Sequence, residues 1–221
     1  MEYLSWLKEA ATDFSRGLPA GGVETLEEVA DAVKLCRACP LHASRRNAVP
    51  GEGTGRSGVM FVGEAPGRNE DEQGRPFVGA AGQLLTDLIT RVLGLRREDV
   101  FITNVVKCRP PGNREPEPEE VATCWRYLEA QVRILRPRII VALGRHAATA
   151  LLAGPGSRPL SINGVRGRPR VVRISGLEVT VFPTLHPAAA LYNRQQVDAL
   201  EEDFRHLSGL LGGGTLDRFL G

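Results

Sequence analysis

The chain has 221 residues, of which 42% are hydrophobic, enough for one sizeable core and, by default, one domain. Its formal net charge of +2 excludes a protein that attracts nucleic acid through a strongly basic overall field. No apolar run approaches the roughly 18 residues of a membrane span, and the first residues lack the apolar segment of a signal peptide. We therefore expect a cytoplasmic protein that does not bind membranes.

The pattern of apolar residues predicts alternating helices and strands. Two helices are expected at the N-terminus, at 1–15 and 24–35, and Thr25 with Glu28 fits a capping box in the second. Three apolar or β-branched runs predict buried strands, and each is followed by a helical segment. The strands are expected at 59–62, 100–106 and 138–143, and the helices at 80–93, 116–135 and 145–152.

Two further strands, at 171–174 and 177–182, are expected to form a hairpin or a pair, and a final helix spans 194–211. The alternation predicts an α/β fold, a three-layer α/β/α sandwich with a central, mostly parallel sheet. We assign all 221 residues to one domain. Its parts are the N-terminal helices (1–35), a core that carries the motifs (36–192), and the C-terminal helix and tail (193–221).

The long polar connection after the first predicted strand is the most informative segment. The 17 residues from Gly63 to Gly79 exceed an ordinary strand–helix loop and include one aromatic residue, Phe77. Open α/β sheets bind their ligands at the carboxyl ends of the strands. Two more polar loops, at 104–114 and around His186, are expected at the same edge, so we predict a ligand site there. The alternative is an ordinary solvent-exposed connection.

The four cysteines predict a metal centre. Cys36 and Cys39 form a C-x-x-C pair, and Cys108 and Cys124, with fifteen residues between them, can meet across a strand–helix turn. Four cysteines in a cytoplasmic chain favour metal over disulfides. Both tetrahedral zinc and an iron–sulfur cluster are bound by four thiolates, and the spacing does not separate them. Four unrelated buried thiols are the structural alternative.

Four motifs in order resemble the family 4 uracil-DNA glycosylases. They read G-E-A-P-G-R-N-E-D at 63–71, G-R-P-F-V-G at 74–79, T-N-V-V-K-C-R-P-P at 103–111 and H-P-A at 186–188. The cysteine spacing is similar to that of this family's 4Fe–4S ligands, which implies a structural 4Fe–4S cluster rather than zinc. The likeness covers most of the chain, from about Cys36 to about Tyr192.

The resemblance implies an enzyme that flips uracil out of DNA and hydrolyses its N-glycosidic bond, leaving an abasic site. We expect Phe77 to stack on the base and Asn104 to read its edge, because one amide offers both a donor and an acceptor. Glu70 is expected to form a wall against the methyl group of thymine. Gly63 and Ala65, in the first motif, are expected to contribute to the same pocket.

The same resemblance implies the catalytic groups. His186 is expected to hydrogen-bond the uracil carbonyl as negative charge develops there. Glu64 would orient or deprotonate the attacking water and stabilise the cationic sugar, and Asn113 would help to hold that water. Family 1 glycosylases carry an aspartate where this chain has Ala65, so the water-activating role passes to Glu64 or to binding energy alone.

The DNA-contacting surface is expected to follow the histidine motif. The segment after His186 resembles the family's loop that enters the minor groove, with Leu191 or Tyr192 as the wedge that fills the vacated stack. Arginines beside the other motifs would contact phosphates. The residues assigned to DNA are Pro187, Ala188, Leu191, Tyr192, Arg109 and Arg114.

Three other functions were weighed. A relative that crosslinks to uracil-containing DNA without turnover would carry a basic, His-containing insertion after the asparagine strand, but residues 107–115 contain no histidine. A metal-stabilised nucleic-acid-binding module would not depend on Glu64. A mismatch or hypoxanthine glycosylase would lack the pair Glu64 and Glu70.

We expect a monomer whose partner is uracil-containing DNA, single- or double-stranded. We also expect a replication clamp to bind the tail at 216–220.

Overall fold

The computed structural model describes residues 23–191 and 193–212, which form one five-stranded sheet in the order β2-β1-β3-β5-β4. Four neighbouring strands run parallel, and the edge strand β4 pairs antiparallel with β5. The expected mostly parallel sheet and its terminal hairpin are therefore confirmed. The strands are β1 (Val59–Gly63), β2 (Phe101–Asn104), β3 (Ile139–Leu143), β4 (Arg170–Ile174) and β5 (Leu177–Thr184).

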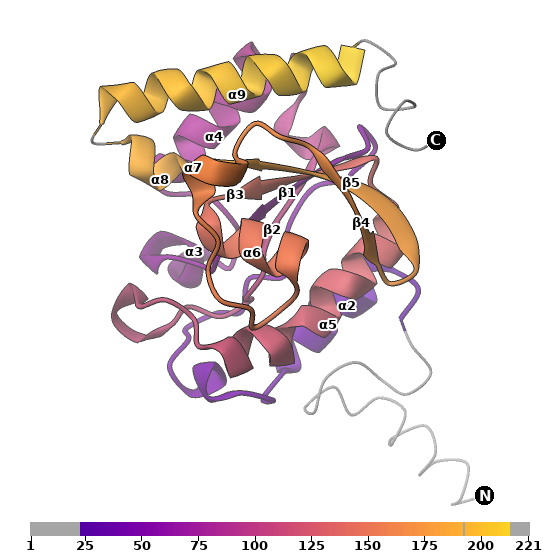
Figure 1. The fold of residues 1–221 in the computed structure, drawn as a ribbon. Helices are drawn as coiled ribbons and strands as arrows, with labels where there is room; N and C mark the ends of the chain where they lie inside the picture. The colour runs from indigo at the N-terminus through magenta and orange to yellow at the C-terminus, as the bar shows by residue number, and fades with distance from the viewer. Residues whose placement is uncertain (1–22, 192, 213–221) are drawn as a thin grey trace, which may run out of the picture.

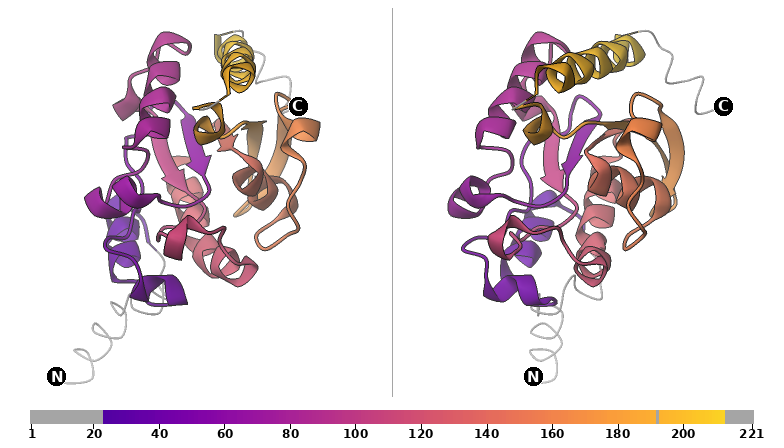
Figure 2. Two further views of the ribbon diagram at one scale, coloured as in Figure 1. Left: turned by 90° about the vertical axis from the view of Figure 1, so that its left-hand side faces the viewer. Right: turned by 60° about the vertical axis from the view of Figure 1, so that its left-hand side comes forward.

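Helices cover both faces of the sheet and complete the predicted α/β/α sandwich (Figure 1). One face packs against α4 (Ala80–Arg91) and α9 (Arg194–Gly212), and the other against α5 (Pro118–Leu135) and α6 (Arg145–Ala153). In both views of Figure 2, α4 and α9 lie near each other at the top of the molecule. The helix α2 (Leu26–Leu35) packs on the outside of α5.

Strands β1, β2 and β3 are buried along their whole length because helices cover both of their faces. Every residue of β1, β2 and β3 is buried. Side chains alternate between the two faces, so Phe61 joins the core under α4 and α9, and Met60 and Val62 join the core under α5 and α6. This continuous burial is the reason that these strands read as apolar runs.

The short elements were not predicted. The expected long loop contains α3 (Arg68–Gln73), and other loops of the described residues contain α7 (Ile162–Val165), α8 (Pro187–Ala190) and three 3₁₀ turns. These turns are η2 (Pro40–Ala43), η3 (Arg97–Asp99) and η4 (Pro111–Asn113). The Thr25–Glu28 capping box is confirmed at the start of α2. The helix expected at 1–15 and the tail at 216–220 lie outside the described residues.

The two edges of the sheet are protected in different ways. At the outer strand β4, Arg170 and Arg173 place charge along the edge. Beyond β2, Glu52 forms an antiparallel bridge with Ile102, with backbone hydrogen bonds of 3.0 and 2.9 Å in the two directions. Unpaired strand edges attract other strands, and charge or a covering segment suppresses that pairing.

The strand order creates a crevice at the carboxyl end of β1. From β1 the chain passes to β2 on one side, and it then returns across β1 to β3 on the other. Where the connections diverge in this way, a crevice opens beyond the strand ends. No helix in the described ranges is long and apolar enough to cross a membrane.

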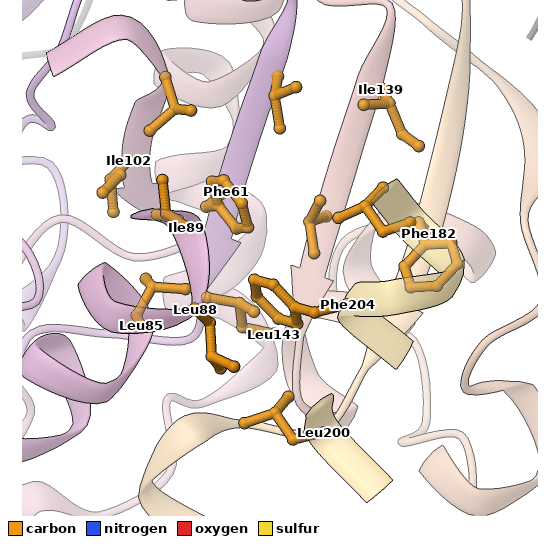
Figure 3. Packing of buried hydrophobic residues seen from close by; sticks show 14 of the residues in the cluster. Phe61, Leu85, Leu88, Ile89, Ile102, Ile139, Leu143, Phe182, Leu200 and Phe204 are labelled. Atoms are coloured by element: carbon orange, nitrogen blue, oxygen red, sulfur yellow. The ribbon is translucent and has the colours of Figure 1, made fainter. Parts of the chain in front are cut away.

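The contact between Phe61 and Phe204 joins β1 to α9 (Figure 3). Their ring centroids lie 6.0 Å apart at an interplanar angle of 14°, and both side chains are fully buried. We predict that Phe204→Ala lowers the free energy of unfolding by about 3–5 kcal/mol, because it removes a buried ring and leaves a cavity. Chemical denaturation would measure this loss.

The matched control is Leu35→Ala, since this large apolar side chain is 57% exposed. It should change stability by no more than about 0.5 kcal/mol. A loss for Phe204→Ala as small as that of the control would contradict the packing role assigned to the ring.

Candidate active site

A pocket of about 360 Å³ opens at the carboxyl ends of β1, β2 and β5. Its volume suits a small, flat ligand. Most of the residues predicted from the sequence meet in its walls. They are Glu64, Asn113 and His186 among the expected catalytic groups, Ala65, Glu70, Phe77 and Asn104 among the base-contacting groups, and Arg114 and Ala188 among the DNA-contacting groups.

Gly63 makes the floor of this pocket compact. In the parallel register it stands opposite Asn104. A Cβ atom at Gly63 would lie 2.4 Å from Asn104 Oδ1 and 2.6 Å from Phe77 Cζ, closer than side-chain atoms can approach. Asn104 is 2% exposed, and its Oδ1 is buried without a hydrogen-bond partner among the described residues. A buried acceptor without a partner costs free energy until a ligand supplies a donor.

Phe77 is held in an unfavourable backbone conformation beside this asparagine. Its φ of 51° lies in the left-handed region, and its ring stacks on that of His186 at 5.6 Å between centroids. At Gly82 in α4, a Cβ atom would lie 1.9 Å from the Phe77 carbonyl oxygen, so only glycine allows this approach. Tight backbone packing of this kind fixes a strained residue in place.

The loop around Phe77 is fixed on both sides by charged groups. Before it, the Arg97 guanidinium donates to the Pro76 carbonyl at 2.7 Å and to Glu52 Oε1 at 2.7 Å. After it, Glu70 Oε1 accepts from the backbone N–H groups of Val78 at 2.8 Å and Gly79 at 2.9 Å. Sequence reasoning missed Arg97 and Glu52, because no local motif indicates a contact between such distant positions.

Glu70 therefore supports the pocket as well as lining it. Its carboxylate sits at the N-terminus of α4, where the free N–H groups of the first turn and the helix dipole favour an anion. The expected wall against thymine stays a prediction. The described contacts assign Glu70 a further role, which is to hold the turn from Phe77 into α4.

His186 follows β5 and begins α8 as its N-cap. The Ala188 backbone N–H donates to His186 Nδ1 at 3.1 Å, so the proton of the neutral ring is on Nε2. Burial lowers the pKa of His186 to about 4, and the Glu70 carboxylate opposes this shift only in part. His186 is therefore a neutral N–H donor at physiological pH.

Glu64 follows β1 directly and lies in the wall between this pocket and an adjoining cavity. Burial raises the pKa of its carboxyl group, and the charge of Glu115 acts in the same direction, whereas His146 and Arg145 act against it. A carboxylate with a raised pKa is a stronger base than one free in water. Its side chain is 32% exposed, so water can reach it.

Asn113 and the two predicted arginines have partners within the protein. Arg109 donates to Asn113 Oδ1 at 2.6 Å, and Arg114 forms a bidentate pair with Glu120 at 2.9 and 2.7 Å. Asn113 has a left-handed φ of 57°, which turns this loop toward the pocket. The expected phosphate contacts of both arginines stay predictions, because a phosphate would have to share or replace these partners.

The segment expected to enter DNA lies beside the pocket mouth. Ala188 lines the pocket, Pro187 is buried, and Leu191 is 38% exposed directly after α8. Tyr192, the other candidate wedge, lies outside the described residues. Exposed apolar side chains of this size are few in the described part of the chain, so Leu191 is suited to contact a base step.

The four cysteines lie around one small internal cavity, so the expected gathering of the thiols is observed. Cys36 ends α2, Cys39 begins η2, Cys108 follows β2 and Cys124 lies in α5. Burial raises the pKa of Cys39, Cys108 and Cys124. Within the described ranges, no three His, Cys, Asp or Glu side chains lie close enough to hold one metal ion.

N–H donors point at these sulfur atoms. The backbone N–H of Ala38 donates to Cys36 Sγ at 3.5 Å, and that of Lys107 to Cys124 Sγ at 3.3 Å. The Arg45 guanidinium donates to Cys108 Sγ at 2.9 Å. Such donors stabilise thiolates rather than neutral thiols. At Cys108 and Cys124 these donors offset part of the effect of burial, which favours the neutral thiol.

Comparison with known proteins agrees with this geometry. The model of the uracil DNA glycosylase superfamily matches residues 50–208. The type-4 uracil-DNA glycosylase of Saccharolobus solfataricus is 52% identical over 90% of this chain and 93% of that protein. The chain belongs to the type-4 uracil-DNA glycosylase family. Type-4 enzymes of Pyrobaculum aerophilum and Thermotoga maritima are each 53% identical, over 88% and 77% of this chain and 97% and 85% of their own lengths.

For this type-4 family member we predict that the His186 ring stays neutral, with its proton on Nε2, through the range where an ordinary histidine with a pKa of about 6.5 becomes charged. Its folded pKa of about 4 lies below the unfolded value. The unfolded chain then binds more protons in that window, so the free energy of unfolding falls as the pH drops through it.

Nitrogen-15 NMR of histidine-labelled protein would report both the charge and the tautomer, with His186→Gln to assign the signal. Titration of this ring near its ordinary pKa, or a proton on Nδ1, would contradict the contact with the Ala188 N–H group.

Proposed function

We propose that the protein excises uracil from DNA by hydrolysis of the N-glycosidic bond. The observation that carries the proposal is the unpartnered Oδ1 of Asn104 beside a pocket walled by Phe77 and His186. Uracil would supply the missing donor from its N3–H group, and the amide N–H₂ of Asn104 would bind the adjacent carbonyl. Cytosine presents the inverse pattern and would leave buried groups unpaired, which disfavours it.

The reaction separates charge, and the pocket suits that separation. As the glycosidic bond breaks, negative charge grows on the uracil and positive charge on the sugar. The Nε2–H group of His186 is already neutral and oriented, so it can donate to the uracil carbonyl without proton transfer. Glu64, on the water-accessible side, would stabilise the cationic sugar and orient or deprotonate the attacking water, with Asn113 nearby.

The remaining pocket groups would act through shape. Phe77, whose loop is held by Arg97 and Glu70, offers an aromatic face for the base. The small residues Ala65 and Gly63 leave room for that base. Glu70 would stand where the thymine methyl group would otherwise fit. Outside the pocket, Pro187, Ala188 and Leu191 are proposed to contact the DNA, and Arg109 and Arg114 to approach its phosphates.

We predict that the protein releases uracil from an oligonucleotide with one uracil opposite guanine, seen as strand cleavage after alkali. Thymine and cytosine at the same position should not be released. Glu64→Gln and His186→Ala should each lower the single-turnover rate at least about 100-fold, because each removes a group that acts in the transition state.

The matched control is His206→Ala, an exposed histidine on α9 away from the pocket. It should behave as the unchanged protein. Absence of uracil release from correctly folded protein would overturn the proposal. A complex with uracil-containing DNA that survives denaturation would instead favour the crosslinking function without turnover.

We also propose that Cys36, Cys39, Cys108 and Cys124 hold a 4Fe–4S cluster. The N–H donors at their sulfur atoms and the buried Tyr127 hydroxyl, which lacks a hydrogen-bond partner in the described structure, fit a negatively charged group in this cavity. One zinc ion would draw all four sulfurs to about 2.3 Å from a single point. A 4Fe–4S cluster would be bound by the same four thiolates, and the likeness of their spacing to this family's cluster ligands favours it over zinc.

When bound, the cluster would act as a covalent junction between the α2–η2 segment and the β2–α5 core, so its binding free energy would stabilise the fold. We predict that anaerobically prepared protein is brown and contains about four irons and four sulfides per chain. Cys124→Ser should lose iron and lower the melting temperature, whereas the neighbouring Thr123→Ser should change neither. Zinc in place of iron, or full stability after metal removal, would contradict the cluster.

Three further expectations are retained as proposals. A replication clamp would bind the tail at 216–220, which lies outside the described residues. The protein is expected to act as a monomer and to be cytoplasmic. Sedimentation with and without the clamp would measure clamp binding and the oligomeric state.

A further inference from the structure

The first turn of α6 lies between the two proposed catalytic groups. This turn starts at Gly144, directly after β3, where φ is 88°. The Gly144 N–H group donates to the Thr184 carbonyl at 2.9 Å, which joins the turn to the end of β5. A Cβ atom at Gly144 would lie 2.9 Å from the Cβ of His186. Two residues later, His146 reaches the opposite side and faces Glu64. One turn of helix therefore contacts both groups.

The His146 ring is mostly enclosed and is surrounded by charge. Its Nε2 lies 3.8 Å from Glu64 Oε2, 3.2 Å from Glu115 Oε2 and 3.1 Å from Arg145 Nε. Its side chain is 17% exposed, compared with 55% for Glu115. Arg145 also pairs with Glu115. Nitrogen Nε2 thus faces two carboxylates and one donor, the Nε–H group of Arg145.

No other basic side chain in the described part of the chain approaches Glu64 as closely. Among the described residues, the Glu64 carboxylate accepts no hydrogen bond, and His146 is the only Lys, Arg or His side chain within 4.0 Å of it. The other charged or titratable groups that line its two cavities are Glu115, Glu117 and Arg114 on the adjoining side and Glu70 and His186 across the pocket. The α6 turn therefore supplies the nearest basic side chain to the Glu64 carboxylate among the described residues.

We propose that His146 is a positioning residue for uracil excision, and that its Nε2–H group holds the Glu64 carboxylate in the direction from which water attacks the sugar. The inference rests on the proposed function, which assigns the water to Glu64. The separation of 3.8 Å is longer than a hydrogen bond, so the contact would have to shorten when substrate binds. Catalytic hydrogen bonds are commonly long before substrate binds.

The contact has a consequence for pH dependence. Burial and Glu115 raise the pKa of Glu64, whereas His146 and Arg145 lower it. Removing His146 leaves the raising influences less opposed, so the Glu64 carboxylate becomes protonated at a higher pH. The acid limb of the rate profile should then move to higher pH. A residue that only stabilised α6 would lower stability without moving this limb.

The experiment is a double-mutant cycle on single-turnover uracil release, measured as a function of pH. The variants are His146→Ala, His146→Gln, Glu64→Gln and the double variant Glu64→Gln/His146→Ala. His146→Ala should lower the rate at neutral pH about 10–100-fold, as loss of an orienting partner does. It should leave binding of uracil-containing DNA unchanged. His146→Gln keeps an N–H donor and should recover part of the rate.

The cycle shows whether the effect passes through Glu64. In the Glu64→Gln background, His146→Ala should change the rate by less than about twofold, because the effects of two substitutions on coupled residues are not additive. His206→Gln serves as the matched histidine control and should leave the rate and the pH profile unchanged. Multiplicative losses in the double variant, or an unmoved acid limb in His146→Ala, would overturn the inference.

The outcomes also separate this inference from the proposed function. If the unchanged protein releases no uracil, the proposed function fails and the role of His146 fails with it. If Glu64→Gln is as active as the unchanged protein, the assignment of water to Glu64 is wrong and His146 cannot act through it. If Glu64→Gln is impaired but His146→Ala is not, only the inference fails.

Discussion

The close approach of Asn104 and Phe77 over Gly63 is the constraint on which the candidate site depends. Parallel pairing places Asn104 opposite Gly63, and the missing side chain lets the amide and the aromatic ring meet there. A methyl group at this position would push them apart and enlarge the pocket floor. The specificity of such a pocket thus begins in strand register, a property of the whole sheet, rather than in the loops.

The site is also rigid before any ligand arrives. The left-handed backbone of Phe77 is unfavourable by about 1–3 kcal/mol on its own. It persists because Arg97 and Glu70 hold the loop on its two sides and Gly82 admits the Phe77 carbonyl. A pocket arranged in advance loses less entropy when it binds a flipped base, and its dipoles need little reorientation during the reaction.

The sequence alone predicted the layers of the fold and most of the residues that line the pocket. Buried parallel strands are apolar along their whole length, so they stand out, and their carboxyl ends bring Glu64, Asn104 and His186 together. The helix α3 was missed because six mostly polar residues present no apolar stripe. The contact of Arg97 with Glu52 and the position of His146 were missed because they depend on tertiary packing across distant segments. The metal and DNA assignments come from resemblance and geometry together.

Glu52 connects two features that are otherwise unrelated. Its backbone covers the free edge of β2, and its carboxylate holds Arg97 and Arg75, which flank the Phe77 turn. The segment that closes the sheet against a foreign strand is thus the same segment that braces the pocket. A chain in which this edge had come open, during folding or on heating, would lose its base-binding surface at the same time. Protection of the sheet edge and support of the pocket therefore depend on the docking of one and the same segment.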